Sequence, residues 1–273
     1  MTIERLLIHI VYTNIIVAIS TASLCAGFTY RIGIDHWYYY GFFGFSSTFA
    51  VYNGQRLIKS ATQKETPWLN WVRKHQRVLY LWVIAMSLGS LCSLLLIGQF
   101  NWKSLVLIAA AGLISLFYIV PIKGRNLREL AYVKIHLIAI TWTVVLIAFP
   151  IVSEEQPIGN LVWVIFAHYL YILAVTIPFD IRDLKYDSKL QKTLPQLMGV
   201  AGSKGLAVIC LAAFAGIMLW QMNSLGSNII FYLAIAVQFL FIILMKESRG
   251  DLYCAGGIDG AISLLGISYF LLQ

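Results

Sequence analysis

The sequence predicts an all-α fold, a polytopic membrane helical bundle of about nine transmembrane helices whose N-terminus is cytoplasmic. Of its 273 residues, 60% are hydrophobic and only 12% are charged, and the mean hydropathy is +0.79. A soluble domain of this length does not need so much apolar surface, whereas a helical membrane protein does. We expect residues 1–273 to form a single integral-membrane domain.

The apolar residues fall into runs of about 20, the length that spans the hydrocarbon core of a bilayer. The first run is longer than a signal-peptide core and lacks a small-residue cleavage site, so we expect it to be retained as the first helix. No run repeats at a fixed period. The nine runs cover residues 7–29, 37–57, 78–98, 103–121, 131–151, 159–179, 204–222, 228–245 and 254–272.

The basic residues give the bundle its predicted orientation. If the N-terminus is inside, the outer segments keep only Arg31 and Lys103, which is a strong positive-inside bias. A missed or additional helix would scramble this pattern. The inner segments then hold Arg5, Arg56, Lys59, Lys64, Arg73, Lys74, Arg77, Lys123, Arg125, Arg128, Lys134, Arg182, Lys185, Lys189, Lys192, Lys204, Lys246 and Arg249.

The net charge of +8 therefore indicates membrane topology and contact with anionic lipid, not nucleic acid binding. We expect a multi-pass protein of the bacterial plasma membrane, with its active face on the cytoplasmic side and no nucleic acid partner. The outer loops are short and nearly neutral. The inner face offers two long polar loops, after the second and the sixth run, and chemistry is expected there.

Three carboxylates stand at the end of the sixth run, at spacing i, i+3 and i+7: Asp180, Asp183 and Asp187. On an α-helix they fall within roughly 60° of arc, so these three residues, the carboxylate cluster, face one way. They repel one another unless a cation lies among them. Oxygen ligands suit Mg²⁺, which usually binds through a few carboxylates and substrate phosphates. The alternative is a solvated helix end with mixed charges.

Two further segments accompany the cluster. The chain continues through Thr193-Leu194-Pro195 and Gly199 to Lys204, and the fourth run ends in Tyr118-Ile119-Val120-Pro121-Ile122-Lys123. With nine predicted helices and two inner polar loops, these segments resemble the UbiA superfamily of intramembrane prenyltransferases over essentially the whole chain. The stretch that begins at Asp180 is similar to the second aspartate motif of that family.

The resemblance implies a cavity open to lipid in which two aspartate motifs hold Mg²⁺ on a prenyl diphosphate. The carboxylate cluster would then be catalytic and would supply the Mg²⁺ ligands. The isoprenoid group would pass to a membrane-soluble acceptor, aromatic or lipid. A terpene-cyclase-like variant would use the same ionisation without an external acceptor.

The first motif departs from the family pattern. Asn53 matches it, but Gly54, Leu57 and Ala61 stand where acids are expected, and Arg56 and Lys59 add positive charge. Three interpretations follow. The two cations bind the diphosphate directly, or they pair with the carboxylate cluster and leave the protein without catalytic activity, or the same scaffold catalyses a different reaction. The candidate diphosphate ligands are Asn53, Arg56, Lys59, Lys123 and Lys189.

The absence of acids from the first motif is also compatible with a function of another class. The protein would then be a non-catalytic membrane protein that binds isoprenoid lipid or a partner enzyme. The motif of a CDP-alcohol phosphotransferase is absent from the sequence, and a transporter would carry charges deeper in several helices. Asp259 lies among glycines in the ninth run. It is either a functional intramembrane acid or part of a close helix contact. His136 and His168 are expected to be helix-to-helix hydrogen bonders.

Overall fold

The computed structural model describes residues 3–62, 65–98, 101–120, 126–130, 132–185, 187 and 191–271. Lys123 and Lys189, two of the candidate diphosphate ligands, lie outside these residues. The described residues form helices and no strand. Their order is α1 (Ile3–Tyr12), α2 (Ile15–Arg31), α3 (Trp37–Thr62), α4 (Pro67–Ile97), α5 (Trp102–Phe117), η1 (Leu127–Glu129), α6 (Lys134–Thr143), η2 (Val144–Ala148), α7 (Phe149–Ser153), α8 (Ile158–Asp183), α9 (Leu194–Gln221), η4 (Asn223–Ser227), α10 (Ile229–Ile243), η5 (Leu252–Ile258) and α11 (Asp259–Phe270).

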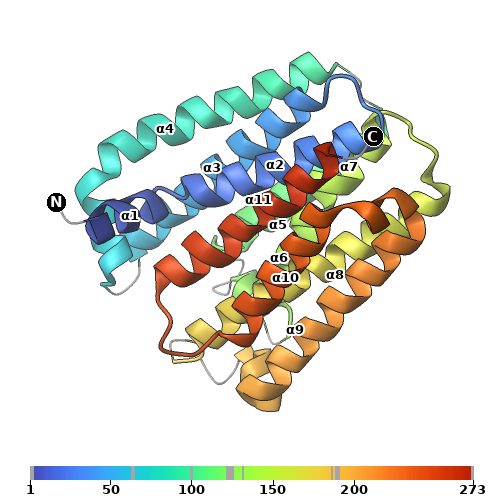
Figure 1. The fold of residues 1–273 in the computed structure, drawn as a ribbon. Helices are drawn as coiled ribbons and strands as arrows, with labels where there is room; N and C mark the ends of the chain where they lie inside the picture. Colours follow the sequence, from blue (N-terminus) through green and yellow to red (C-terminus); the bar gives the residue numbers. More distant parts are fainter. Residues whose placement is uncertain are drawn as a thin grey trace.

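The helices form a bundle of rods with the two chain ends at opposite ends of the long axis (Figure 1). Within the described residues, five helical segments are long and apolar enough to cross a membrane: Pro67–Ile97, Lys134–Ser153, Leu161–Asp183, Leu194–Gln221 and Leu252–Phe270. The bent pair α1 and α2 makes a sixth if it counts as one span, and α5 and α10 are apolar but shorter. The all-helical class is confirmed; nine spans and a cytoplasmic N-terminus stay predictions.

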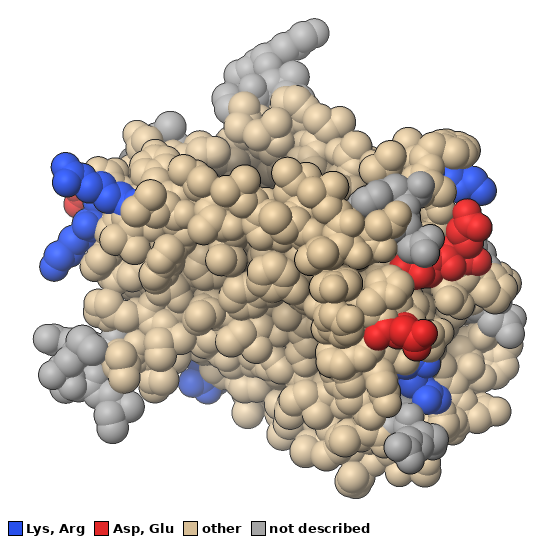
Figure 2. Space-filling view, turned by 90° about the horizontal axis from the view of Figure 1, so that it is seen from above, with Lys and Arg blue, Asp and Glu red and all other residues tan. Residues whose placement is uncertain are grey.

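The surface has the charge distribution of a protein that sits in a bilayer. In Figure 2, most charged side chains lie toward two opposite ends, and the described surface between them is uncharged except for one basic side chain at the lower edge. On α4, Leu81, Leu88 and Leu95 are each more than half exposed. Such a belt is stable against lipid tails, where it does not have to be buried by protein. The protein is therefore consistent with a membrane location.

α1 and α2 meet at an angle of 61°, and the break between them is built from polar side chains. Asn14 at the break has a left-handed backbone with φ of 57°. The carbonyl groups that the break frees are satisfied from neighbouring helices: Asn53 Nδ2 donates to Thr13 O at 3.0 Å, and Trp68 Nε1 donates to Tyr12 O at 3.0 Å. Satisfying these groups matters because unpaired backbone is costly away from water.

α2 and α11 pack at the centre of the bundle through small residues (Figure 1). Gly27 and Gly266 oppose each other so closely that a Cβ on either would overlap backbone atoms of the other helix. Ser263 takes part in two bonds across the contact, with Ser20 Oγ to Ser263 Oγ at 2.9 Å and Ser23 Oγ to Ser263 O at 3.2 Å. Small residues that allow close backbone approach, with polar bonds between helices, are what stabilises helix pairs in a membrane.

α8 is tied to α11 by a buried histidine. His168 Nδ1 lies 2.8 Å from Val164 O, which can only accept, so Nδ1 carries the proton. Nε2 is therefore an acceptor, and Tyr269 Oη donates to it at 2.9 Å. The prediction that His168 is a helix-to-helix hydrogen bonder is confirmed. His136 behaves likewise, with Nδ1 2.6 Å from Tyr169 Oη.

Candidate functional site

A cavity of about 770 Å³ runs into the bundle from the end where α3 and α8 finish. Its lining residues on α3 extend from Phe43 to Lys59, a path of roughly 24 Å at the helical rise per residue. The inner part is lined largely by apolar side chains, which include Leu94, Ile108, Leu137, Val145, Leu146, Ile172 and Val175. The outer part, toward Lys59, is lined by charges. The cavity thus changes from apolar to charged along its length.

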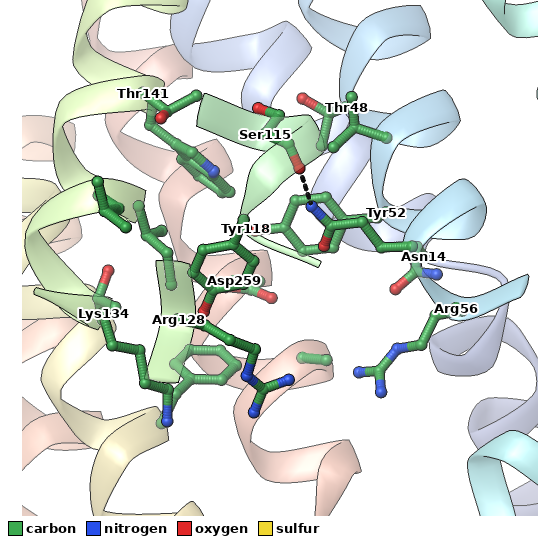
Figure 3. A pocket seen from close by; sticks show the side chains of 18 of the residues that line it. Asn14, Thr48, Tyr52, Arg56, Ser115, Tyr118, Arg128, Lys134, Thr141 and Asp259 are labelled. Carbon is green, nitrogen blue, oxygen red and sulfur yellow. Dashed lines mark hydrogen bonds between the residues drawn. The ribbon is translucent and has the colours of Figure 1, made fainter. Parts of the chain in front are cut away.

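One wall of the charged end is basic. Arg56, Lys59 and Arg128, the basic cluster, line the cavity, and in Figure 3 the guanidinium groups of the two arginines point toward one another. Arg56 packs on Trp68 at 3.7 Å from the ring centroid, and Arg128 lies 6.0 Å from the ring of Tyr118. Within the described part of the chain, no carboxylate lies within 4 Å of any member of the cluster. Basic side chains that face a cavity without a carboxylate in contact are a candidate site for an anion.

The opposite wall is acidic, and a lysine lies at its centre. Lys134 Nζ lies 2.9 Å from Asp180 Oδ1, 3.6 Å from Asp183 Oδ2 and 2.8 Å from Asp187 Oδ2. The contact with Asp187 is a hydrogen bond, whereas the contact with Asp180 is an ion pair without hydrogen-bond alignment. The three carboxylates do face one way, as the spacing predicts. The cation among them is a side chain from the start of α6.

Two loops hold Lys134 in this position. Tyr132 N donates to Gln191 O at 3.2 Å, which joins the segment before α6 to the segment before α9. Gln196 Nε2 donates to Asp187 O at 3.3 Å, so the loop that carries Asp187 is also fixed to α9. Tyr132 and Lys192 both have left-handed backbones, with φ of 67° and 45°. Conformations of this kind cost energy and persist where the surroundings impose them.

A chain of ion pairs continues from the carboxylate cluster. Arg182 Nε lies 2.8 Å from Asp183 Oδ1, and Arg182 NH1 lies 3.2 Å from Asp251 Oδ1. Asp251 precedes η5, so these contacts join the end of α8 to the start of the last helical segment. Each aspartate of the cluster therefore has a cation within 4 Å. Lys134 and Arg182 thus neutralise part of the acidic wall, whereas the basic cluster has no carboxylate within 4 Å among the described residues.

The residues present do not fit the Mg²⁺ that the resemblance implies. The Lys134 ammonium occupies the position on which the carboxylate cluster converges, with Nζ 2.9 Å from Asp180 Oδ1 and 2.8 Å from Asp187 Oδ2, so a Mg²⁺ ion could bind there only if the lysine moved away. Among the residues described, no group of three or more His, Cys, Asp or Glu side chains is arranged to hold a metal ion.

Asn53 faces away from the cavity. Its Nδ2 donates to Thr13 O and Phe49 O, and its Oδ1 accepts from Asn14 Nδ2 at 3.0 Å. Both amide protons are therefore used inside the protein, and Asn53 is not among the residues that line the cavity. Asn53 matches the family pattern in sequence, but in this structure its amide has a structural role at the break between α1 and α2.

Asp259, at the start of α11, also lines the cavity. Its residue is 7% exposed, and within the described chain no donor or cation is bonded to its carboxylate. A buried, unpaired acid in a cavity is a candidate functional group.

Sequence reasoning placed Arg56, Lys59 and the carboxylate cluster at one site, and the structure brings them to one cavity. The pairing of Arg56 or Lys59 with the cluster, one of the three interpretations, is not what the structure has, because Lys134 holds that place. Lys134 and Arg128 were predicted only as inner-face charges. The position of Lys134 inside an apolar run was the available signal, since an ionisable residue there is a functional candidate.

Comparisons with protein-family models, with curated proteins and with solved structures give no match.

Proposed function

We propose that this protein is a membrane prenyltransferase that binds an isoprenoid diphosphate in the cavity and transfers its isoprenoid group to a membrane-soluble acceptor. The observation that carries the proposal is the basic cluster at the mouth of an apolar cavity: Arg56, Lys59 and Arg128 lack carboxylate partners within 4 Å in the described chain. An amphipathic anion with a long apolar tail is complementary to both parts. The resemblance to the UbiA superfamily supplies the reaction type.

The arrangement supports ionisation of an allylic diphosphate. As the bond between carbon and oxygen breaks, negative charge grows on the leaving diphosphate, and the basic cluster would stabilise it. Arg56 suits this role because a guanidinium binds phosphate oxygens in pairs and its packing on Trp68 limits its motion. The carbocation would remain in the apolar part, where the rings of Tyr52 and Trp142 line the wall.

Binding of the substrate is the first test. Purified protein in detergent is titrated with farnesyl diphosphate, and its midpoint of thermal unfolding is followed. We expect farnesyl diphosphate to raise the midpoint more than farnesol or inorganic diphosphate, since each of these offers half of the ligand. Equal effects of farnesyl diphosphate and farnesol would overturn the proposal.

A charge variant locates the diphosphate. Lys59→Met keeps the apolar stem and removes the ammonium, and we expect it to weaken farnesyl diphosphate binding about tenfold or more, because a bond to a charged group contributes about 1.5–3 kcal/mol. Lys204→Met is the matched control, because the Lys204 ammonium bonds to Ile243 O and does not line the cavity. Similar losses in both variants would contradict the assignment.

The second candidate function is a non-catalytic protein that binds isoprenoid lipid, and the ion pairs of Lys134 favour it because they compensate the carboxylate cluster. Release of inorganic diphosphate from bound farnesyl diphosphate separates the two. Release supports the enzyme, and binding without release over many hours supports the lipid binder. Analysis of the released hydrocarbon separates transfer from a terpene-cyclase-like reaction.

A further inference from the structure

We infer that the ammonium of Lys134 takes the place of a divalent metal ion among Asp180, Asp183 and Asp187, so that the cavity binds its anionic ligand without Mg²⁺. The inference reverses the expectation that the carboxylate cluster holds Mg²⁺. That the ligand is a diphosphate rests on the proposed function. That a lysine takes the place of the metal ion does not, because the contacts of Lys134 do not depend on which ligand is bound.

The geometry is that of an ammonium, not of a vacant metal site. Three carboxylates surround Lys134 Nζ at 2.8 to 3.6 Å: the ammonium donates a hydrogen bond to Asp187 and forms ion pairs with Asp180 and Asp183. Asp180 and Asp187 have side chains that are 2% and 4% exposed, and the Lys134 side chain is 8% exposed. A divalent ion at this position would have to displace the Lys134 ammonium from all three carboxylates.

Lys134 is held from both sides of the cluster. It stands in the first turn of α6, two residues after the left-handed Tyr132, whose backbone N–H is bonded to Gln191 O. On the opposite side, Gln196 fixes the backbone of Asp187. A freely moving surface lysine would not need this support. The contacts therefore indicate a fixed positive charge in the wall of the cavity.

The distribution of charge shows where a ligand would lie. Lys134 and Arg182 between them neutralise part of the acidic wall, whereas the basic cluster faces the same cavity without carboxylate partners within 4 Å in the described residues. In a metal-dependent site, phosphate would be attracted to the acidic wall through the ions. Here a phosphate would contact the arginines and lysine of the basic cluster directly, and the acidic wall would orient Lys134 and Arg182.

The first experiment measures the cation alone, with Mn²⁺ as the probe in place of Mg²⁺. Purified wild-type protein is titrated with Mn²⁺, and free Mn²⁺ is read by electron paramagnetic resonance. We expect no stoichiometric binding to the wild type and about one bound ion per chain in Lys134→Ala, which exposes the three carboxylates. The double variant Lys134→Ala with Asp187→Asn should lose that ion, and Lys204→Ala, which removes a lysine outside the cavity, should behave as the wild type.

Two results would overturn the inference: stoichiometric Mn²⁺ binding to the wild type that Asp187→Asn removes, or no gain of Mn²⁺ binding in folded Lys134→Ala. If Lys134→Ala does not fold, the comparison of wild type with Asp187→Asn decides, because it requires no change at Lys134.

The second experiment measures farnesyl diphosphate binding to wild-type protein in EDTA and in excess Mg²⁺. We expect affinities that agree within about twofold, since the protein supplies the positive charge. Binding that falls tenfold or more in EDTA would overturn the inference and leave the proposed function standing. Absence of binding under both conditions would overturn the proposed function, and the Mn²⁺ experiment would then decide the inference by itself.

Discussion

The contact between α2 and α11 gives the sharpest prediction about the fold, because one methyl group tests it. Gly266→Ala places a Cβ 2.5 Å from Leu24 N and closer still to the Ser23 carbonyl, and these are backbone atoms that cannot rotate away. The helices must therefore separate. Overpacking of this kind costs about 1–3 kcal/mol. Separation also weakens the two bonds of Ser263 to α2, each of which contributes about 0.6 kcal/mol in a membrane protein.

The sum predicts a loss of about 2–4 kcal/mol in the free energy of unfolding for Gly266→Ala. Gly216→Ala is the matched control: Gly216 is also inside a helix, α9, but a Cβ there meets no atom within 4 Å. We expect this change to be neutral or to stabilise by up to about 1 kcal/mol, because alanine is the better helix former. The assay is equilibrium unfolding in mixed micelles with increasing dodecyl sulfate. Equal stabilities of the two variants would refute the close contact between α2 and α11.

Three further predictions concern buried polar groups and use the same unfolding assay. Lys134→Met should lower the free energy of unfolding by about 3–5 kcal/mol, because it leaves the carboxylate cluster without its central cation. The control Lys204→Met should change it by less than about 0.5 kcal/mol. Comparable losses in the two variants would contradict the buried ion pairs. Tyr269→Phe should cost about 1–3 kcal/mol, because the His168 acceptor loses its donor, whereas Tyr232→Phe, whose hydroxyl bonds to an exposed carbonyl, should cost little. Asp259→Asn should fold at least as stably as the wild type, because no bonded partner of its carboxylate is lost; a loss as large as that of Lys134→Met would mean that Asp259 is held structurally.

The sequence was a good guide to the helices because the signal for them is local. Runs of apolar residues predict helix wherever backbone groups must be paired without water, and each predicted run overlaps a helical segment of the structure. The break between α1 and α2 was not predicted, since Thr13 and Asn14 look unremarkable inside an apolar run. What makes the break stable is Asn53 and Trp68, which are about 40 and 55 residues away.

The site was predicted in part for the same reason. The spacing of Asp180, Asp183 and Asp187 is local, so their common direction followed from helical geometry. Their counter-ion comes from Lys134, 46 residues before the first of them, and no periodicity relates the two positions. The sequence therefore predicts that these acids need a cation, and only the tertiary structure identifies Lys134 as that cation.

The most direct test of the whole account is a structure of the protein with a non-ionisable analogue, farnesyl thiodiphosphate, bound in the presence of Mg²⁺. The account predicts that the diphosphate lies on Arg56, Lys59 and Arg128, that the isoprenoid chain runs into the apolar part of the cavity, and that Lys134 remains on the carboxylate cluster. A diphosphate held on Asp180 and Asp183 through metal ions, with Lys134 displaced, would contradict it.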